Sequence, residues 1–540
     1  MIYIDSLNLA FISFIKSFLN YFTTHLNFDV TPEITFYIKF SITTYNICLI
    51  FMVIAFFLNM MSSLFFKGIS YISKVVRFFN INILVILLTL LFFKLYITLK
   101  IESVLGVYFY DIKINFFKIN NDINYLEHFT VLSSSFSDSI LILSIVVGLI
   151  CVELLGSKNL FNSFNNMNIF FLFTIFVTIM VTTNNLLIMF ISFEFIFLPT
   201  VYFAYTKGYS KKIDIASEIL IYWTLFGSFL VLINLAYIFH FYGTVNYLFL
   251  NQVKFSKFEI IFIFINFLIG FGIKIPLAPL HYWLLKVHVE SPTAFSIYLS
   301  GFLVKSALYC LYMFLSIFNN NNIYLSLIVW IIYSLIIGTL GLARQVDIKK
   351  LIAWATIQEM SFMLFFLILK QLFLVHTCIL FIILHGLMSS YMFYIVDILQ
   401  RRFKTRSLHY IKGLNLLLPE MTKYIWYLIL LFSGFPLTVK FFIEWSVVSL
   451  LIETNRFLLL IILFFLNFLG TVFFCKIMFT IIYGSPSYSK QDLELCEIQK
   501  KEKVILNMLL FLISLLFLLM FMIKWLKKKN LYIAVYGDWM

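Results

Sequence analysis

Charged residues are scarce in this sequence. Only 12% of its 540 residues are Asp, Glu, Lys or Arg, whereas 62% are hydrophobic and the mean hydropathy is +1.01. Soluble domains contain about 25% charged and about 45–50% apolar residues. A soluble chain of this length has too little interior to hide so much apolar surface. The composition therefore predicts an integral membrane protein.

Patterns for metals, redox cofactors and disulfides are also missing. The six cysteines contain no CxxC pair, and no two of the eight histidines have the spacing of haem ligands on one helix. We therefore expect no disulfide, metal or redox cofactor in this chain. The net charge of +14 comes without a basic face interleaved with aromatic residues, so we expect no nucleic-acid binding. The first five residues carry no basic group, and membrane insertion is expected to rely on the transmembrane helices.

Fourteen apolar segments are long enough to cross a bilayer as helices, which needs about 20 residues each. They lie near 38–60, 81–99, 138–155, 168–184, 186–205, 216–240, 258–276, 293–316, 323–344, 350–370, 372–396, 424–446, 456–482 and 503–526. The apolar stretch 7–22 contains Lys16 and is either an interfacial helix or a fifteenth span. Loops after odd-numbered spans carry about three times as many Lys and Arg as the others, which places them on the negative side of the membrane and both termini on the opposite side.

Six ionisable residues interrupt these apolar segments, although each costs about 2.5–3.5 kcal/mol at the centre of a membrane helix. They are Glu194, Lys274, Lys305, Glu359, His385 and Glu444. Burial favours the neutral form of such a group, and an opposite charge nearby favours its charged form. A buried Glu–Lys pair is therefore near balance and can gain and lose a proton. We interpret the set as a proton relay; the alternative is that its members are satisfied ion pairs that only hold helices together.

Helix-breaking residues accompany two of these charges. The chain has only eight prolines, yet three fall within residues 276–292. The seventh helix is expected to break beside Lys274, at Gly272, Pro276 and Pro279, and the twelfth to break at Gly434 and Pro436, before Glu444. Broken helices in corresponding positions of two halves are typical of transporters built from inverted repeats. The sequence thus predicts two inverted five-helix repeats, helices 4–8 and 9–13.

Four regions follow from this reading. They are three N-terminal helices with their loops (1–167), a first repeat (168–316), a second repeat (323–482) and a C-terminal loop with a last helix (483–540). His281 and His288 lie just past the first break and are candidates for proton access, with metal binding together with Glu290 as the alternative.

Several of these segments resemble the antiporter-like subunits of respiratory complex I. Residues 272–284 (GIKIPLAPLHYWL) and 288–294 (HVESPTA), followed by Lys305, are similar to the family signature. Further similarities lie at 192–194 (SFE), 223–228 (WTLFGS), 347–354 (DIKKLIAW), 385–387 (HGL) and 434–444 (GFPLTVKFFIE). The similarity extends from about residue 186 to 446. Glu444 favours the branch that contains subunit 4, because the subunit 2 and 5 types usually have Lys there.

The resemblance implies a role for each charged residue. Glu194 and Lys274 would form the pair of the first half, Lys305 would link the halves, His385 would continue the axis, and Glu444 would be the terminal site. Glu359 departs from the family, which normally has a His at that position, and Lys286 replaces a family Asp. The implied partners are the subunit 2-like and subunit 5-like chains. NADH, FMN, iron–sulfur clusters and ubiquinone are expected in other subunits.

The implied function is proton translocation in the mitochondrial inner membrane, as a subunit of proton-translocating NADH:ubiquinone reductase. Two alternatives remain open at this stage. One is a subunit of a multi-subunit sodium/proton antiporter, which shares the same pattern of buried charges. The other is a membrane scaffold that transports nothing.

Overall fold

The computed structural model describes residues 131–155, 160–207, 213–253, 255–317, 321–368, 372–486 and 498–517, together with 110–112 and scattered positions between 44 and 98. The positions described between 44 and 98 are helical, but most of the first two predicted spans lies outside the described residues. Residues 500–517 form a helix where the last span is predicted, and the predicted remainder, to 526, is not described.

The first half consists of helices and one short strand pair. Its elements are β1 (Tyr110–Ile112), β2 (Val131–Ser133), α4 (Ser135–Leu155), α5 (Leu160–Thr182), α6 (Leu186–Lys207), α7 (Ile213–Tyr242), α8 (Tyr247–Leu250), α9 (Lys257–Lys274), α10 (Tyr282–Glu290), α11 (Thr293–Tyr298), the π-helical turn η2 (Leu299–Leu303) and α12 (Val304–Ser316). The antiparallel pairing of β1 with β2 lies in a segment that sequence reasoning treats as a connecting loop.

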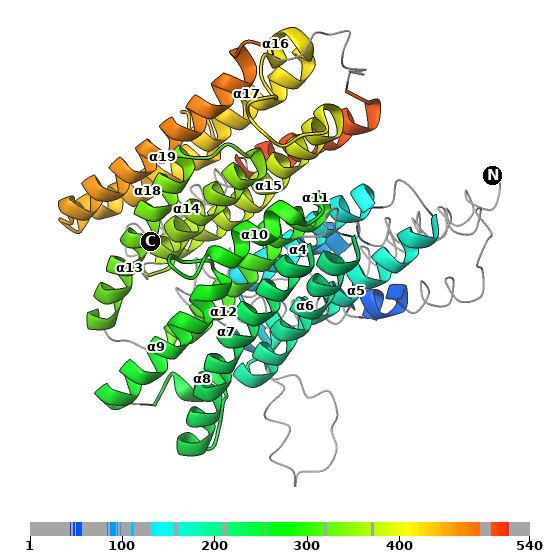
Figure 1. The fold of residues 1–540 in the computed structure, drawn as a ribbon. Coiled ribbons are helices and arrows are strands. Elements are labelled where there is room, and N and C mark those ends of the chain that lie inside the picture. The colour runs from blue at the N-terminus through cyan, green and yellow to red at the C-terminus, as the bar shows by residue number, and fades with distance from the viewer. Residues whose placement is uncertain are drawn as a thin grey trace, which may run out of the picture.

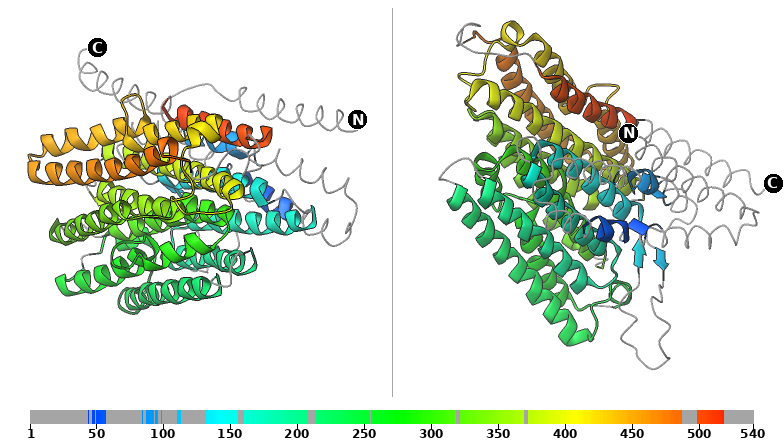
Figure 2. Two further views of the ribbon diagram at one scale, coloured as in Figure 1. Left: turned by 45° about the horizontal axis from the view of Figure 1, so that its top comes forward. Right: turned by 90° about the vertical axis from the view of Figure 1, so that its right-hand side faces the viewer.

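The named elements of the second half are all helices within its described residues. It consists of α13 (Asn321–Ala343), α14 (Ile348–Ile368), α15 (Leu372–Phe403), α16 (Leu414–Leu417), α17 (Pro419–Ser433), α18 (Val439–Glu453) and α19 (Phe457–Tyr483). The long helices lie side by side, with α7 towards one edge and α19 towards the opposite edge (Figures 1 and 2).

Six helices within the described residues are long and apolar enough to cross a membrane. They are Ile213–Tyr242, Thr293–Ser316, Ser326–Ala343, Ile348–Ile368, Thr377–Phe403 and Phe457–Tyr483. The edge helices α7 and α19 expose large apolar side chains, among them Phe229 (61% exposed), Leu458 (73%) and Phe464 (62%). Such surfaces fit hydrocarbon and not water. The chain is therefore an all-helical membrane protein with several apolar spans, apart from its short strand pair.

Several predicted boundaries are wrong by several residues, such as the start of α5 at Leu160, predicted near 168, and the end of α18 at Glu453, predicted near 446. The sequence predicts that the eleventh helix ends near residue 396, but α15 continues to Phe403. Ion pairs stabilise the additional turns, since Arg401 contacts Asp397 at 2.8 Å and Glu502 at 3.3 Å, and Arg402 contacts Glu502 at 2.6 Å. Hydropathy alone cannot detect helical turns that are held by charged side chains.

Candidate functional site

Glu194 and Lys274 form an ion pair between α6 and α9. Nζ of Lys274 contacts Oε1 of Glu194. The Lys274 side chain is fully buried, whereas that of Glu194 is 28% exposed. Nζ also lies 4.4 Å from the ring centroid of Phe193 and 4.9 Å from that of Phe197. Aromatic faces attract cations, so the ammonium has partners on α6 besides the carboxylate.

The chain leaves helical geometry directly after Lys274. Pro276 has no N–H to continue the hydrogen-bond ladder, and the next helix, α10, begins at Tyr282. Two indole groups satisfy carbonyls in this region: Trp283 Nε1 donates to the oxygen of Ile273 at 2.7 Å, and Trp330 Nε1 donates to that of Ala278 at 2.6 Å. The break is thus fixed by specific hydrogen bonds.

Lys305 is on α12, two residues after the π-helical turn η2, which packs against α4 and α15. Its side chain is fully buried, and Nζ donates to the backbone oxygen of Ser300. Glu359 is the acidic group that acts on it electrostatically. π-Helical turns are often found at functional sites. Here the turn leaves a carbonyl close enough for the buried ammonium to bind.

His385 on α15 belongs to the same central region. Its side chain is 2% exposed, and its Nδ1 has no hydrogen-bond partner among the described residues. Lys305 and Lys440 are the charged groups that act on this imidazole. The helices approach closely here, because a Cβ on Gly386 would lie 2.8 Å from the backbone oxygen of Gly301 in η2. The imidazole is therefore within electrostatic reach of two buried lysines.

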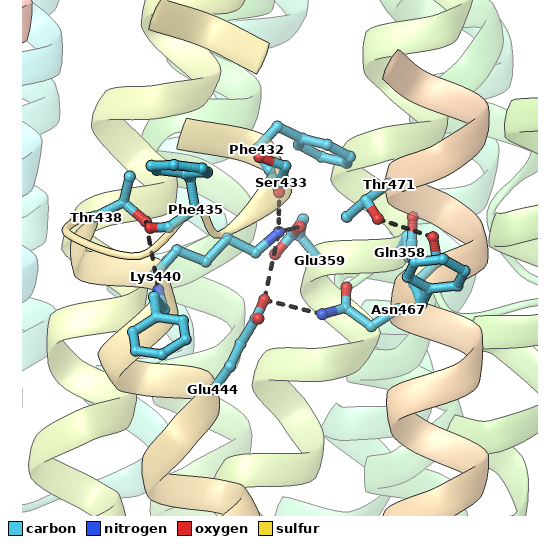
Figure 3. Close-up of polar contacts among 12 residues, drawn as sticks. Gln358, Glu359, Phe432, Ser433, Phe435, Thr438, Lys440, Glu444, Asn467 and Thr471 are labelled. Carbon is cyan, nitrogen blue, oxygen red and sulfur yellow. Dashed lines mark hydrogen bonds and ion pairs between the residues drawn. The ribbon is translucent and has the colours of Figure 1, made fainter. Parts of the chain in front are cut away.

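The third group of charges contains two acids and one base (Figure 3). Nζ of Lys440 lies 2.6 Å from Oε1 of Glu359 and 3.7 Å from Oε1 of Glu444. It also donates to the backbone oxygen of Phe432 at 2.6 Å. Asn467 of α19 donates to Oε1 of Glu444 at 2.9 Å. The group therefore joins α14, α17, α18 and α19.

Gly434 connects this group to the interruption between α17 and α18. Its φ is +64°, a left-handed conformation that favours glycine. A Cβ at this position would also lie 3.0 Å from Oε2 of Glu444. Thr438 then begins α18 by accepting a hydrogen bond from the backbone N–H of Phe441 at 3.5 Å. Gly434 is therefore constrained both by its backbone and by the neighbouring carboxylate.

The two candidate histidines make no hydrogen bond or ion pair with these groups among the described residues, although Lys305 acts electrostatically on His288. His281 immediately precedes α10, and its ring lies 5.0 Å from that of Trp354. His288 is fully buried on α10 and stacks on Phe393 at 4.9 Å. Neither ring nitrogen of His288 has a hydrogen-bond partner among the described residues. The described residues also contain no group of three His, Cys, Asp or Glu that could hold a metal ion.

Sequence reasoning missed three buried lysines as site residues among the described residues, Lys94, Lys349 and Lys440, and the last two lie in the region that resembles the family. Lys440 is within one helical turn of Glu444, and this spacing was the available signal. Lys349 is 1% exposed, and its Nζ donates to the backbone oxygen of Ser291 at 3.1 Å. It lies near the start of α14, where the predicted boundary made it a loop residue.

Comparisons with known proteins agree on one family. Residues 183–470 match the family model described as NADH:quinone oxidoreductase/Mrp antiporter, transmembrane. NADH-ubiquinone oxidoreductase chain 4 of Paramecium tetraurelia is 34% identical over 358 residues, which cover 65% of this chain and 75% of that protein. The chain 4 protein of Acanthamoeba castellanii is 30% identical over 345 residues, covering 63% and 69%.

Solved structures share the fold at low sequence identity. A chain in the structure of the Mrp complex from Dietzia sp. DQ12-45-1b has a TM-score of 0.69 at 18% identity, covering 81% of this chain and 80% of its own length. A chain of the membrane-bound sulfane sulfur reductase, an archaeal respiratory membrane complex, has a TM-score of 0.71 at 16% identity, covering 90% and 96%.

Proposed function

We propose a function from one premise, that this chain belongs to the NADH:quinone oxidoreductase/Mrp antiporter family of transmembrane proteins. The chain is the subunit 4-like, proton-translocating membrane subunit of respiratory complex I. Its work is to move protons along buried Glu, Lys and His side chains, driven by redox chemistry in partner subunits. The partners are the subunit 2-like and subunit 5-like chains, and the complex lies in the mitochondrial inner membrane. NADH, FMN, iron–sulfur clusters and ubiquinone belong to those other subunits.

The observation that carries this proposal is the buried pairing of opposite charges at both ends of the described bundle. Lys274 with Glu194 and Lys440 with Glu359 each join two helices in the apolar interior. Replacing a buried ion pair with apolar residues is often neutral or stabilising. Stability alone is therefore a weak reason to retain these groups, whereas proton transfer requires them.

We infer a direction for the relay from which groups act on one another. Lys305 and Lys440 both act electrostatically on His385, and the Glu194–Lys274 pair and the group around Lys440 each adjoin a helix interruption. We infer that a proton taken up near His281 and His288 passes by way of the Glu194–Lys274 pair to Lys305, continues through His385 to Lys440 and Glu359, and leaves at Glu444. Interrupted helices supply free backbone groups that bind water, and water chains conduct protons.

The group around Lys440 explains how one proton is held and released. With Lys440, Glu359 and Glu444 all ionised, the group carries a net charge of −1 in an apolar surrounding. One added proton makes the group neutral, which burial favours. Glu444, 19% exposed, is better placed than Glu359, 2% exposed, to exchange that proton with its surroundings.

Changes in the pKa values of the relay residues can supply the free energy needed to move a proton against the membrane potential. Moving one charge against 100 mV costs about 2.3 kcal/mol. A change of one pKa unit corresponds to about 1.36 kcal/mol, so shifts of about two units per site are sufficient. Reorienting one ion pair can produce such shifts.

The remaining architecture is part of the proposal. We infer about fourteen spans with two inverted five-helix repeats, 168–316 and 323–482, whose fourth helices are the interrupted ones. Residues 1–167 and 483–540 would flank them. The positions of Lys274 at the end of α9 and of Lys440 at the start of α18 support this, since each interruption adjoins a buried lysine that binds a carboxylate of another helix.

The test compares Lys274→Met with Lys286→Met in the assembled complex. Lys286 is an exposed lysine on α10, so its loss should leave function unchanged. We expect Lys274→Met to abolish coupled proton translocation while the complex still assembles, measured as protons moved per NADH oxidised in sealed vesicles. Full proton yield in Lys274→Met would refute the proposed role.

The same family contains sodium/proton antiporters, and the fold shared with a chain of an Mrp complex favours that alternative. It predicts sodium-dependent transport by this chain without any NADH-oxidising partner. Identification of the proteins that co-purify after mild detergent extraction separates the two. Flavoprotein and iron–sulfur partners would support complex I.

A further inference from the structure

A third buried ion pair lies outside the residues that match the family model. Nζ of Lys94 is 2.9 Å from Oδ1 of Asp138, and both side chains are fully buried. Thr98 donates to the other carboxylate oxygen of Asp138 at 3.1 Å. Lys94 and Thr98 belong to the helical positions between 84 and 98, and Asp138 is in the first turn of α4. The pair thus joins two N-terminal helices within the apolar interior.

The helix that carries Asp138 packs directly against the centre of the proposed relay. A Cβ on Gly301 of η2 would lie 3.0 Å from Val147 of α4, and one on Gly386 of α15 would lie 2.6 Å from Leu143. Gly386 follows His385, and Gly301 precedes Lys305 by four residues. α4 therefore touches both segments that carry the central titratable groups.

Tyr309 connects Lys305 with the neighbourhood of Asp138. It is one helical turn beyond Lys305 on α12, about 6 Å along the helix. The Tyr309 ring lies 5.3 Å from that of Phe136, two residues before Asp138, and Asp138 acts electrostatically on the Tyr309 hydroxyl. That hydroxyl donates to the backbone oxygen of Val181 at 3.2 Å. Tyr309 therefore follows Lys305 by one turn of α12 and packs beside the start of α4, within electrostatic reach of Asp138.

The candidate uptake residue His288, Lys305 and Tyr309 follow one another along the segment that runs from α10 through α11 and η2 to α12. His288 is on α10 and the contact of Lys349 with Ser291 follows it, both just before α11, whereas Lys305 follows η2. Tyr309 comes later, towards the end of α12 at Ser316. Asp138 is therefore on the opposite side of Lys305 from the proposed uptake region around His288.

We propose that Asp138, with Lys94 as its counter-ion, is a proton-accepting site on a branch from Lys305 to the membrane face at which α12 ends. This rests on the proton-translocating function proposed above. One proton passes from the Lys305 ammonium, through the Tyr309 hydroxyl or a water molecule, to the Asp138 carboxylate. Lys305 becomes neutral and Asp138 a neutral acid. The nearby Lys94 ammonium then favours release of that proton to the aqueous phase.

The experiment uses the whole complex in sealed vesicles and counts protons moved per NADH oxidised. Asp138→Asn keeps the size of the side chain and an oxygen for Thr98, but cannot accept the proton. The double variant Lys94→Met/Asp138→Asn leaves no unpaired buried charge, which separates a relay role from a folding defect. Asp214→Asn, an exposed acid in the first turn of α7, is the matched control.

We expect Asp138→Asn and the double variant to assemble, to oxidise NADH and to lose part of the proton yield. Asp138→Glu should recover part of it, because a carboxylate is restored. Full proton yield in the double variant would overturn the proposal, and so would failure of the double variant to assemble, which would make the pair a structural link. If Lys274→Met also retains full yield, the translocating function itself fails. If Lys274→Met loses it while the double variant is normal, only this branch fails.

Discussion

Lys440 lies closer to an acid on another helix than to the acid one turn away on its own helix. Its Nζ is 2.6 Å from Glu359 on α14 and 3.7 Å from Glu444 on α18. The stronger contact therefore crosses between helices, and the weaker one leaves Glu444 with Asn467 as its nearer polar partner. This unequal sharing of one ammonium determines which carboxylate is free to exchange a proton.

Removing the acid that holds Lys440 should destabilise the complex. In Glu359→Gln, the buried ammonium loses its closest charged partner, and breaking such a pair costs about 3–5 kcal/mol. We expect a lower thermal unfolding temperature of the purified complex and loss of proton yield. Glu359→Gln/Lys440→Met should regain stability without regaining proton transfer. Glu453→Gln, at an exposed acid that ends α18, is the control, and an equal loss of stability in this variant would contradict the prediction.

Gly434→Ala should lower the proton yield by more than the strain of its left-handed backbone alone would cause. A left-handed conformation costs a non-glycine residue about 1–2 kcal/mol. The added Cβ would also press on Oε2 of Glu444 from 3.0 Å. Gly243→Ala is a matched control, since Gly243 has φ +67° and nothing within 4 Å of the added Cβ. We expect reduced proton yield per NADH only in Gly434→Ala, and similar yields in the two variants would refute the steric explanation.

His288→Phe tests the proposed uptake side. Phenylalanine can keep the stacking on Phe393 but cannot carry a proton. We expect the complex to assemble with a lower rate of proton translocation at unchanged thermal stability. His240→Phe, at an exposed position on α7, should have no effect. An unchanged translocation rate in His288→Phe would exclude this histidine from the path.

Trp283→Phe should loosen the break that follows Lys274. It removes the 2.7 Å hydrogen bond to the buried carbonyl of Ile273, and leaving such a group unsatisfied costs about 1–3 kcal/mol. The expected result is a lower unfolding temperature together with weaker coupling. Trp445→Phe is the control because Trp445 is exposed. Equal losses of stability and coupling in the two variants would contradict the prediction, because they would follow from the smaller ring and not from the lost hydrogen bond.

The buried charges, the helix breaks and the membrane class can be predicted from residue types alone. A charge inside a long apolar segment identifies Glu194 or Lys305 without any structure, and proline and glycine beside Lys274 or Glu444 indicate where helices end. These signals are local. The membrane class follows from composition for the same reason.

Other features depend on packing between distant segments. The pairing of Lys440 with Glu359 spans 81 residues and requires α14 to lie beside α18. The π-helical turn at Leu299–Leu303 has no distinct composition, and its effect is to free the Ser300 carbonyl for Lys305. The Lys94–Asp138 pair was missed because Lys94 and Asp138 were assigned to separate helices with no sequence pattern joining them.

The unbroken length of α15 has a mechanical consequence. Its 32 residues extend about 48 Å, which exceeds the roughly 30 Å of hydrocarbon in a typical bilayer. The helix must therefore tilt or project into the water, and a thicker or thinner lipid phase changes its inclination. His385 and Arg402 lie 17 residues apart on this one rod, so the ion pair of Arg402 with Glu502 anchors the depth at which the imidazole sits.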